Sequence, residues 1–360
     1  MTVANSLLAS KIEKRGVFVC GGGHQGIAMA GHLALHGYDV TLWNRTPENI
    51  AQIKETGEVH CSGICNGTAK ISRVTSDISQ AAGKLIMVAV PSTAHKEIAR
   101  RLAPFLDGDS IVVLNPGRTF GAVEFAKELE SSGVRHLPHI AETQTIVYTC
   151  RRIGANSVSI HALKRDVEIA SLRKNDMSII MKAIPKCIRG RFLPVASIGV
   201  TSVGNVGMVL HCAPVLMNIG WIETPDADFK YYYHGISPSI ASFLEKIDAE
   251  RVLVGQAMGV ESKSTAEWMN RTYGIQGRNI FDCIQNNNAY REIDAPATIK
   301  TRYVLEDIPN GLVPIASIGR ELGVSTECID SIITLGSEVL GEDFWRSGRR
   351  IPFDQIKPYL

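Results

Sequence analysis

Short, mainly apolar runs alternate with segments of mixed polarity through the first half of the chain. The apolar runs are residues 17–20, 40–43, 84–90 and 110–114. Continuous apolar runs of this kind are typical of strands that are buried on both faces of a parallel sheet. The segments between and after them have helical spacing, at residues 27–35, 47–56, 94–106 and 122–131. This alternation predicts an α/β fold with a doubly wound sheet, whose ligand lies beyond the carboxyl ends of the strands.

Beyond residue 195 the pattern changes to longer helical segments. These segments are Val203–Asn218, Ile240–Met258, Ser264–Tyr273, Ile315–Leu322 and Thr326–Leu340. Two shorter β-like pieces, 145–149 and 157–160, are expected to extend the sheet of the first half. Because 360 residues exceed what one hydrophobic core usually organises, we expect two domains. The sequence predicts a Rossmann-type dinucleotide-binding domain at residues 1–195 and a mostly α-helical substrate and catalytic domain at residues 196–360.

A glycine-rich turn directly follows the first apolar run. Gly21, Gly23 and Gly26 form the pattern G-x-G-x-x-G. The first glycine permits the tight turn, the second lets a pyrophosphate approach the backbone, and the third lets the next helix pack closely on the strand. His24 and Gln25 lie in the turn that leads into that helix, whose N-terminus can bind a phosphate. These five residues are therefore predicted to bind a dinucleotide.

The residues after the second strand bear on which dinucleotide binds. An NAD site usually has Asp or Glu here, whereas this chain has Asn44, Arg45 and Thr46. The Arg45 guanidinium can bind a 2′-phosphate bidentately, and its two neighbours can donate further hydrogen bonds. We therefore predict NADP(H) in preference to NAD(H); the alternative is that Arg45 is a solvated charge stacked on the adenine. Val90 and Pro91, at the end of the third strand, complete the predicted cofactor site.

One histidine has informative surroundings. On a helix, Gly204 and Gly207 lie on the same face as His211, two turns and one turn before it. Glycine in a helix interior costs roughly 1 kcal/mol relative to alanine, so two in line indicate that something approaches closely. A ligand is one candidate. The other is a neighbouring helix, with His211 as a core histidine.

A short polar segment near residue 305 carries a second candidate group. Arg302 and Asp307 lie in it, and the chain must turn at Pro309. Its ordinary interpretation is a surface helix in which Arg302 and Glu306, four residues apart, form an ion pair. In the first domain, Arg118 follows a strand end and is a candidate for binding an anionic substrate group or the cofactor phosphate.

Composition and charge exclude several classes of partner. With 38 basic and 36 acidic side chains, a formal net charge of +2 gives no reason to expect nucleic acid or an anionic membrane. The first ten residues have too short an apolar stretch for an export signal, so we expect a soluble protein of the cytoplasm. Cysteines lie at positions 20, 61, 65, 150, 187, 212, 283 and 328. Because they lack C-x-x-C spacing, we expect reduced thiols and no metal site.

Longer segments of the chain resemble the opine dehydrogenases of octopine and nopaline type, among them bacterial enzymes that act on carboxyethyl-norvaline. Besides the glycine turn, the similar segments are 114–117, 121–125, 142–151, 201–202, 205–211, 235–239, 245–251, 288–291 and 301–314. The resemblance implies a helical second domain that closes over the nicotinamide, with His211 and Asp307 as the catalytic pair. It further implies that Arg302 binds a substrate carboxylate and that Asn205 orients substrate or nicotinamide. It thus favours functional roles for His211 and Asp307 over the ordinary interpretations.

The reaction implied by the resemblance joins the amine of an amino acid to an α-keto acid, usually pyruvate, and reduces the imine to a secondary amine dicarboxylate. A histidine can serve as base and then as acid in such a condensation, and an aspartate bonded to its far nitrogen would fix the tautomer. Family habit also suggests a homodimer. Two departures are the missing acid at Asn44 and Arg45, which disfavours NAD, and Arg118 in place of a small residue, which indicates a more polar substrate pocket.

Two other functions stay open on the sequence. The first is an NAD(P)-dependent reductase of a simple 2-oxo acid or a phosphorylated ketone. Such reductases generally carry a catalytic lysine on the corresponding helix, and residues 201–219 contain none. The second is a protein that binds NADP as a redox sensor without turnover, for which His211 and Asp307 would be incidental.

Overall fold

The computed structural model describes residues 16–226 and 228–360. They divide into two compact units, which we call unit 1 (residues 16–201) and unit 2 (residues 202–358). The division falls within helix α8 (Ile198–Val203), a few residues after the boundary expected from the sequence. The N-terminal stretch considered for an export signal lies outside the described residues.

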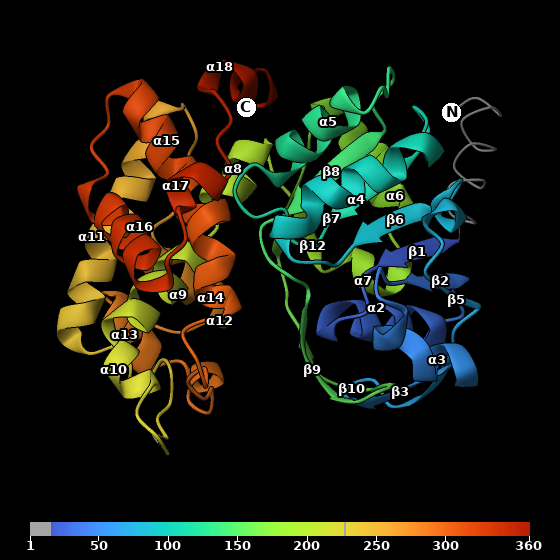
Figure 1. The fold of residues 1–360 in the computed structure, drawn as a ribbon, viewed down its shortest axis with the longest axis horizontal. Coiled ribbons are helices and arrows are strands. Elements are labelled where there is room, and N and C mark those ends of the chain that lie inside the picture. Colours follow the sequence, from blue (N-terminus) through green and yellow to red (C-terminus); the bar gives the residue numbers. More distant parts are fainter. Residues whose placement is uncertain (1–15, 227) are drawn as a thin grey trace. The chain divides into compact units, whose positions relative to one another are not determined.

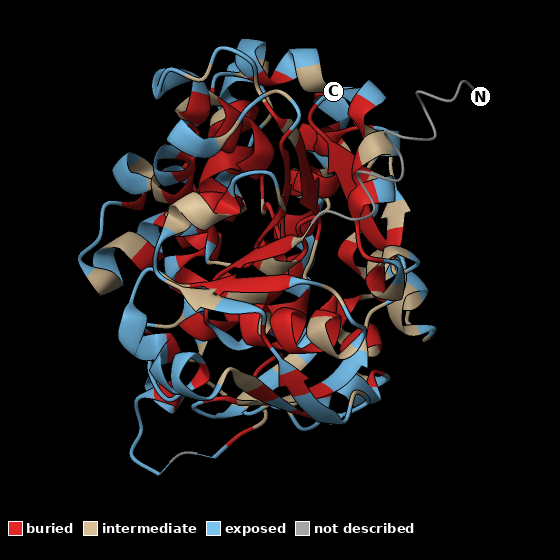
Figure 2. Ribbon diagram, turned by 90° about the vertical axis from the view of Figure 1, so that its right-hand side faces the viewer, coloured by how far each residue is buried: buried red, intermediate tan, exposed pale blue. Residues whose placement is uncertain are grey.

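Unit 1 is built on an eight-stranded sheet in the order β12-β11-β8-β7-β6-β1-β2-β5. Its strands are β1 (Val17–Cys20), β2 (Val40–Trp43), β5 (Arg73–Thr75), β6 (Leu85–Val88), β7 (Ile111–Leu114), β8 (His139–Thr143), β11 (Val167–Ser171) and β12 (Phe192–Pro194). The strands from β5 to β8 are mutually parallel, and β11 pairs antiparallel to β8. Every residue of β1, β2, β6 and β7 is buried, which explains their almost entirely apolar sequences. Figure 2 shows buried residues in red through the interior of the protein. The predicted doubly wound sheet is confirmed.

Among the described residues, six helices accompany these strands, of which the first four correspond to the predicted helical segments and the last two were not predicted. They are α2 (His24–Leu35), α3 (Ala51–Thr56), α4 (His95–Leu102), α5 (Gly121–Ser131), α6 (Met177–Ala183) and α7 (Lys186–Arg189). Helix α2 begins three residues before the predicted start at residue 27, because the glycine turn itself provides its first turn with Gly23 as N-cap. A short 3₁₀ helix, η1 (Pro47–Ile50), precedes α3.

A second, four-stranded sheet in unit 1 corrects one expectation. Residues 145–149 and 157–160 do not extend the large sheet. The last two residues of the first piece begin β9 (Tyr148–Gly154), and the second piece lies in β10 (Ser157–Leu163). These two strands form the order β4-β3-β10-β9 with β3 (Glu58–Gly63) and β4 (Gly67–Lys70). This sheet packs against α2 (Figure 1). Buried and more exposed residues alternate through the first part of β10, as one covered face requires.

The regular elements of unit 2 in the described residues are helices joined by loops, and one isolated bridge links Lys230 with Asp294. Its longer helices are α9 (Gly207–Met217), α11 (Pro238–Ala257), α12 (Thr265–Tyr273), α13 (Ile280–Gln285), α15 (Val313–Leu322) and α16 (Glu327–Leu340). Shorter ones are α10 (Ile219–Ile222), α14 (Arg302–Leu305), α17 (Phe344–Ser347) and α18 (Phe353–Ile356). A π-helix, η7 (Ile308–Leu312), leads directly into α15.

The predicted helix over residues 203–218 is interrupted. The chain leaves helical hydrogen bonding at residues 204–206, so Gly204 lies in the break and Gly207 is the first residue of α9. The buried Arg251 guanidinium holds the end of α8 by donating to the carbonyl of Val203 at 2.6 Å. The two glycines therefore do not form a groove along one continuous helix.

The stretch 198–217 is also the one described segment that is long and apolar enough, by length and composition alone, to cross a membrane. Within its most apolar window, 72% is buried inside the protein. That burial accounts for its apolar composition as part of a hydrophobic core.

Candidate functional site

An imidazole and a buried carboxylate from distant parts of unit 2 lie in direct contact. His211 Nδ1 is 2.7 Å from Asp307 Oδ2, although 96 positions separate them in the chain. Asp307 is 1% exposed, while the His211 side chain is 17% exposed. Because a carboxylate only accepts hydrogen bonds, Nδ1 is the donor, and Nε2 is left with its lone pair. This tautomer makes Nε2 a base with an orienting acid behind it.

The position of Asp307 depends on the close approach of η7 to helix α9. Asp307 is the N-cap of this π-helix, whose second residue is Pro309. A Cβ at Gly311 would lie 2.8 Å from the Cβ of Met208 on α9, so only glycine fits there. A segment therefore does approach the His211 helix closely, at Gly311, a glycine that the sequence pattern did not single out. The alternative of a surface helix holds only for α14, where Arg302 and Leu305 are exposed, because residues 306–312 are all buried.

The backbone around His211 is fixed by an unusual pair of contacts. Pro214 lies inside α9 and has no N–H, so the carbonyl of Leu210 loses its helical partner. The hydroxyl of Tyr231 takes this place, 3.3 Å from the Leu210 oxygen and 2.7 Å from that of His211. The helix can therefore carry a proline one turn after the imidazole without leaving a buried carbonyl unsatisfied.

Two further tyrosines surround the imidazole, and the sequence interpretation missed both. Tyr303 of α14 stacks on the His211 ring at a centroid distance of 4.1 Å. The hydroxyl of Tyr232 lies 3.2 Å from Nε2. Burial, with smaller contributions from neighbouring groups, raises the pKa of Tyr232 well above its usual value, so this phenol stays protonated and can donate to Nε2. The only sequence signal of Tyr232 is the tyrosine run at 231–233, and neither this run nor Tyr303 has a spacing that links it to residue 211.

Arg302 forms the ion pair that its spacing predicts. Its Nε and Nη2 donate to Oε2 of the buried Glu306 at 3.0 and 2.8 Å. The Arg302 side chain is nevertheless 56% exposed, and its Nη1 forms no hydrogen bond or ion pair with the described residues. One edge of the guanidinium is thus anchored and the other can bind a carboxylate. Asn205 is buried in the break before α9, with its amide beside Gly311.

In unit 1, the glycine turn has the close contacts that its pattern predicts. A Cβ at Gly26 would lie 1.7 Å from the carbonyl oxygen of Gly21, which any larger residue would displace. Gly21 has a positive φ of 132°, and a Cβ there would meet the carbonyl of Ala89 and the side chain of Val90. Val90 therefore supports the turn, while Pro91 is exposed and opens the next 3₁₀ turn.

The residues at the start of α2 fit a bound dinucleotide. A Cβ at Gly23 would meet nothing within 4 Å, so the approach to the helix N-terminus is open. The first turn contains His24, Gln25 and Gly26 and no acidic residue that would repel a phosphate. Gln25 Nε2 donates to the carbonyl of Tyr148, whereas its buried Oε1 has no hydrogen-bond partner among the described residues. A ligand hydroxyl or amide can satisfy that acceptor.

The residues predicted to select the dinucleotide are partly engaged within the protein. Asn44 Oδ1 accepts from the N–H of Gly22 at 2.9 Å, and its Nδ2 donates to the carbonyl of Thr46 at 2.8 Å. Asn44 therefore fixes the glycine turn and keeps one amide hydrogen for a ligand. Arg45 is 57% exposed and forms an ion pair with Glu97 of α4 through Nη1. Its remaining donors point to no other described residue.

A group with metal-ligating side chains lies elsewhere in unit 1. His32, His36 and Cys187 have ligand atoms within 4.8 Å of one another. His32 Nδ1 is hydrogen-bonded to the Tyr148 hydroxyl at 3.0 Å, and His36 Nδ1 donates to the His32 carbonyl at 2.9 Å. Burial, followed by the charges of His36 and Arg191, lowers the pKa of His32 to about 4. These contacts give both imidazoles a structural role, and the prediction of no metal is tested by elemental analysis of the purified protein.

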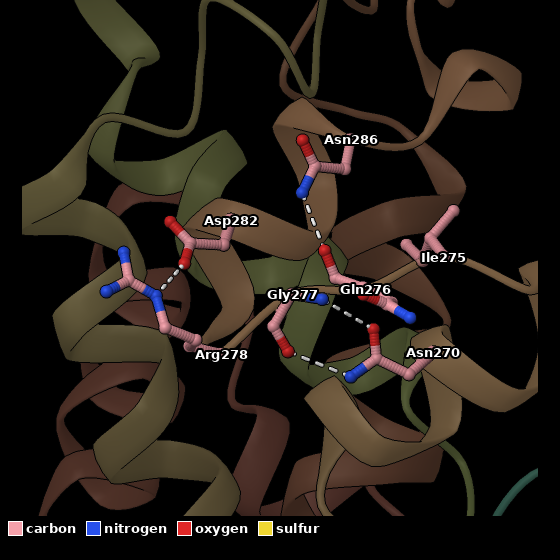
Figure 3. Close-up of a pocket in the computed structure, with 7 residues that line it drawn as sticks. All are labelled: Asn270, Ile275, Gln276, Gly277, Arg278, Asp282 and Asn286. Atoms are coloured by element: carbon pink, nitrogen blue, oxygen red, sulfur yellow. Dashed lines mark hydrogen bonds and ion pairs between the residues drawn. The ribbon is translucent and has the colours of Figure 1, made fainter.

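A polar hollow in unit 2 lies among residues 270–286 (Figure 3). Asn270 donates to the Gly277 carbonyl at 2.8 Å and accepts from its N–H at 2.9 Å. Asn286 donates to the carbonyl of Gln276, and Arg278 pairs with Asp282. These side chains stabilise the loop that they line, so the hollow is no candidate for the chemistry.

Two families match separate parts of the chain. The alpha-helical domain of NAD/NADP octopine/nopaline dehydrogenases matches residues 194–340. The ketopantoate reductase PanE/ApbA family matches residues 17–124, which belong to unit 1. This family match is confined to unit 1, whereas the solved structure of a PanE/ApbA family ketopantoate reductase from Ralstonia eutropha covers 90% of this chain and 97% of its own, with a TM-score of 0.61 at 16% identity.

Individual relatives cover nearly the whole chain. An opine dehydrogenase of Arthrobacter sp. (strain 1C) is 34% identical over 343 residues, covering 94% of this chain and 95% of the relative. Octopine dehydrogenase in complex with NADH and agmatine has a TM-score of 0.75 at 18% identity, covering 91% of this chain and 90% of its own. NADP⁺-bound yersinopine dehydrogenase has a TM-score of 0.75 at 13% identity, with coverages of 96% and 98%. At these identities the two structures establish the fold alone.

Proposed function

The chain belongs to the opine dehydrogenases, NAD(P)-dependent oxidoreductases that act on CH–NH donors, and we propose that it condenses an α-keto acid of pyruvate type with an amino acid, using NADPH. The product is a secondary amine dicarboxylate. The observation that carries this proposal is the contact of His211 with the buried Asp307.

The condensation needs a group that first removes a proton and later returns one. A free amino acid carries an ammonium group near neutral pH, so a base must deprotonate it before it attacks the keto carbon. Loss of water from the resulting carbinolamine then needs an acid. His211 Nε2 serves both steps, because the proton that it takes from the ammonium is the proton that it donates to the leaving hydroxyl.

Asp307 and Tyr232 support this proton transfer. Asp307 keeps the Nδ1–H tautomer and stabilises the imidazolium that forms between the two steps. The Tyr232 hydroxyl occupies the position next to Nε2 at 3.2 Å and can pass a proton between Nε2 and the substrate oxygen. Arg302 binds a substrate carboxylate through the edge that Glu306 leaves open.

Unit 1 would hold the dinucleotide, with its pyrophosphate on the amides that begin α2 and its adenosine near Asn44 and Arg45. The bound nicotinamide supplies the hydride that reduces the imine carbon. Preference for the phosphorylated dinucleotide is supported by Arg45, a mostly exposed guanidinium at the position where an NAD site usually has an acid.

The test is turnover by His211→Ala in the presence of pyruvate, a mixture of amino acids and NADPH. We expect turnover to fall by orders of magnitude while the NADPH dissociation constant stays nearly unchanged. His161→Ala, at an exposed histidine on β10, is the matched control and should remain fully active. An active His211→Ala enzyme would refute the assignment.

Omitting either substrate should abolish NADPH oxidation, because the reducible imine needs both. Oxidation with pyruvate alone would instead identify a simple keto acid reductase. A screen of single amino acids at fixed pyruvate then identifies the amine substrate. The expected homodimer is checked by light scattering of the purified protein.

A further inference from the structure

Three polar side chains of unit 1 follow strands whose ends lie together. Arg118 comes after β7 and Thr145 after β8, two neighbouring parallel strands whose carboxyl ends share one edge of the large sheet. Lys164 comes directly after β10, and its N–H donates to the carbonyl of Val147 at 2.9 Å. Carboxyl ends of parallel strands are where doubly wound sheets bind ligands.

Lys164 makes few contacts for a half-buried cation. Its Nζ donates to Thr145 Oγ1 at 3.2 Å, and no carboxylate among the described residues forms an ion pair with it. Its charged neighbour is another cation, Arg118, which lies close enough to disfavour the protonated amine. The ammonium of Lys164 therefore lies beside a second cation, without an ion pair of its own among the described residues, at an edge where an anion would stabilise its charge.

We propose that Lys164, with Thr145 and Arg118, binds the carboxylate of the α-keto acid. This assignment rests on the proposed function and adds a binding site for the keto acid to it. Of the three residues, the sequence analysis named only Arg118 as a candidate for binding substrate. Lys164 donates a charge-assisted hydrogen bond to one carboxylate oxygen, Thr145 turns its hydroxyl to the anion, and Arg118 contributes the second charge.

The choice of substrate follows from where the hydride must go. The carbon that is reduced is the former keto carbon, which is bonded directly to the keto acid's carboxylate. That carboxylate must therefore lie near the nicotinamide, which occupies the half of a doubly wound sheet away from the glycine turn. β8 is three strands from β1, about 14 Å at the usual strand spacing. The cofactor's pyrophosphate, which binds at the glycine turn after β1, is therefore too far away to be the anion that Lys164 binds.

The charge on Lys164 depends on pH in the range where enzymes are assayed. Burial, followed by the charge of Arg118, lowers the pKa of Lys164 to about 8, and Cys150 on β9 opposes this shift. Burial raises the pKa of Cys150 to about 12, so the thiol is neutral in this range. Arg118 stays charged, so Lys164 alone among these groups loses its charge as the pH passes about 8.

The experiment compares Lys164→Met and Lys164→Arg with Arg165→Met, which removes the exposed cation next in the chain. For Lys164→Met we expect the KM for pyruvate to rise roughly 10- to 100-fold, with kcat and the NADPH dissociation constant nearly unchanged. Lys164→Arg should restore most of the affinity, and Arg165→Met should leave it intact. In the wild type the KM for pyruvate should rise above pH about 8, whereas in Lys164→Arg it should stay flat.

An unchanged KM for pyruvate in Lys164→Met would overturn the assignment. A weaker affinity for NADPH in this variant, without a raised KM for pyruvate, would also overturn it and would identify the anion as a cofactor phosphate. If the protein turns over no keto acid with any amino acid, the proposed function fails on its own. Calorimetric titration of pyruvate into the protein with NADP⁺ still decides the Lys164 site in that case. Binding that is lost in Lys164→Met supports the site, and equal binding or none in the wild type contradicts it.

Discussion

Replacing Asp307 by asparagine removes one charge from the site and almost no volume. Asp307 is 1% exposed and its Oδ2 lies 2.7 Å from His211 Nδ1, so the charges of the carboxylate and an imidazolium are about 4 Å apart. At an effective dielectric constant of 20 this attraction is about 4 kcal/mol. Because the His211 side chain is 17% exposed, water offsets part of this loss. We therefore expect kcat to fall by about 10²- to 10³-fold.

The assay is stopped-flow measurement of reduced-nicotinamide absorbance at saturating keto acid and amino acid, so that kcat is separated from KM. The asparagine can still accept from Nδ1, so the variant should fold, and the NADPH dissociation constant should not change. Asp282→Asn, which breaks a surface ion pair with Arg278 in the same unit, is the control and should retain wild-type turnover. A loss of less than about tenfold in Asp307→Asn would show that the buried charge does not stabilise a catalytic imidazolium.

Three further predictions concern the binding sites. Arg302→Ala should raise the KM of a carboxylate substrate with little change in kcat, measured by steady-state kinetics; an unchanged KM would leave Arg302 as the structural partner of Glu306. Arg45→Ala should weaken NADPH but not NADH, whereas Glu97→Gln, which frees Arg45 from its ion pair, should tighten NADPH by up to about fivefold in a fluorescence titration. Gly26→Ala should lower the melting temperature and abolish dinucleotide binding, because its Cβ would lie 1.7 Å from a carbonyl oxygen.

The large sheet was predictable because a strand covered on both faces has to be apolar at every position. That signal is absent from the second sheet. Its strand β4 has the sequence Gly-Thr-Ala-Lys, with only Ala69 buried, so neither an apolar run nor a long alternation marks it. The helix break before α9 was missed for a different reason. In the sequence, Gly204 is compatible with a continuous helix. The break depends on the Arg251 side chain, which binds the carbonyl of Val203 although 48 positions separate the two residues.

The same limit applies to the site. The pair Arg302 and Glu306 was predictable because residues four apart on a helix are neighbours. No spacing links His211 with Asp307, which are 96 positions apart, so their pairing came from the family resemblance and its geometry from the fold. Lys164 was missed because its position follows from β10 pairing in the second sheet, which the sequence pattern did not reveal.

The identity of the base also bears on which reaction this fold performs. Reduction of a simple keto group needs one proton donated to the developing alkoxide, and a lysine ammonium, with a usual pKa near 10.4, is suited to donation alone. Condensation with an amine needs one group that accepts a proton and then returns it, and such a group works best when its two forms are both accessible near neutral pH. Imidazole meets this requirement and a lysine amine does not. The contact of His211 with a buried carboxylate, on a helix that carries no lysine, therefore supplies the two-way proton transfer that amine condensation requires.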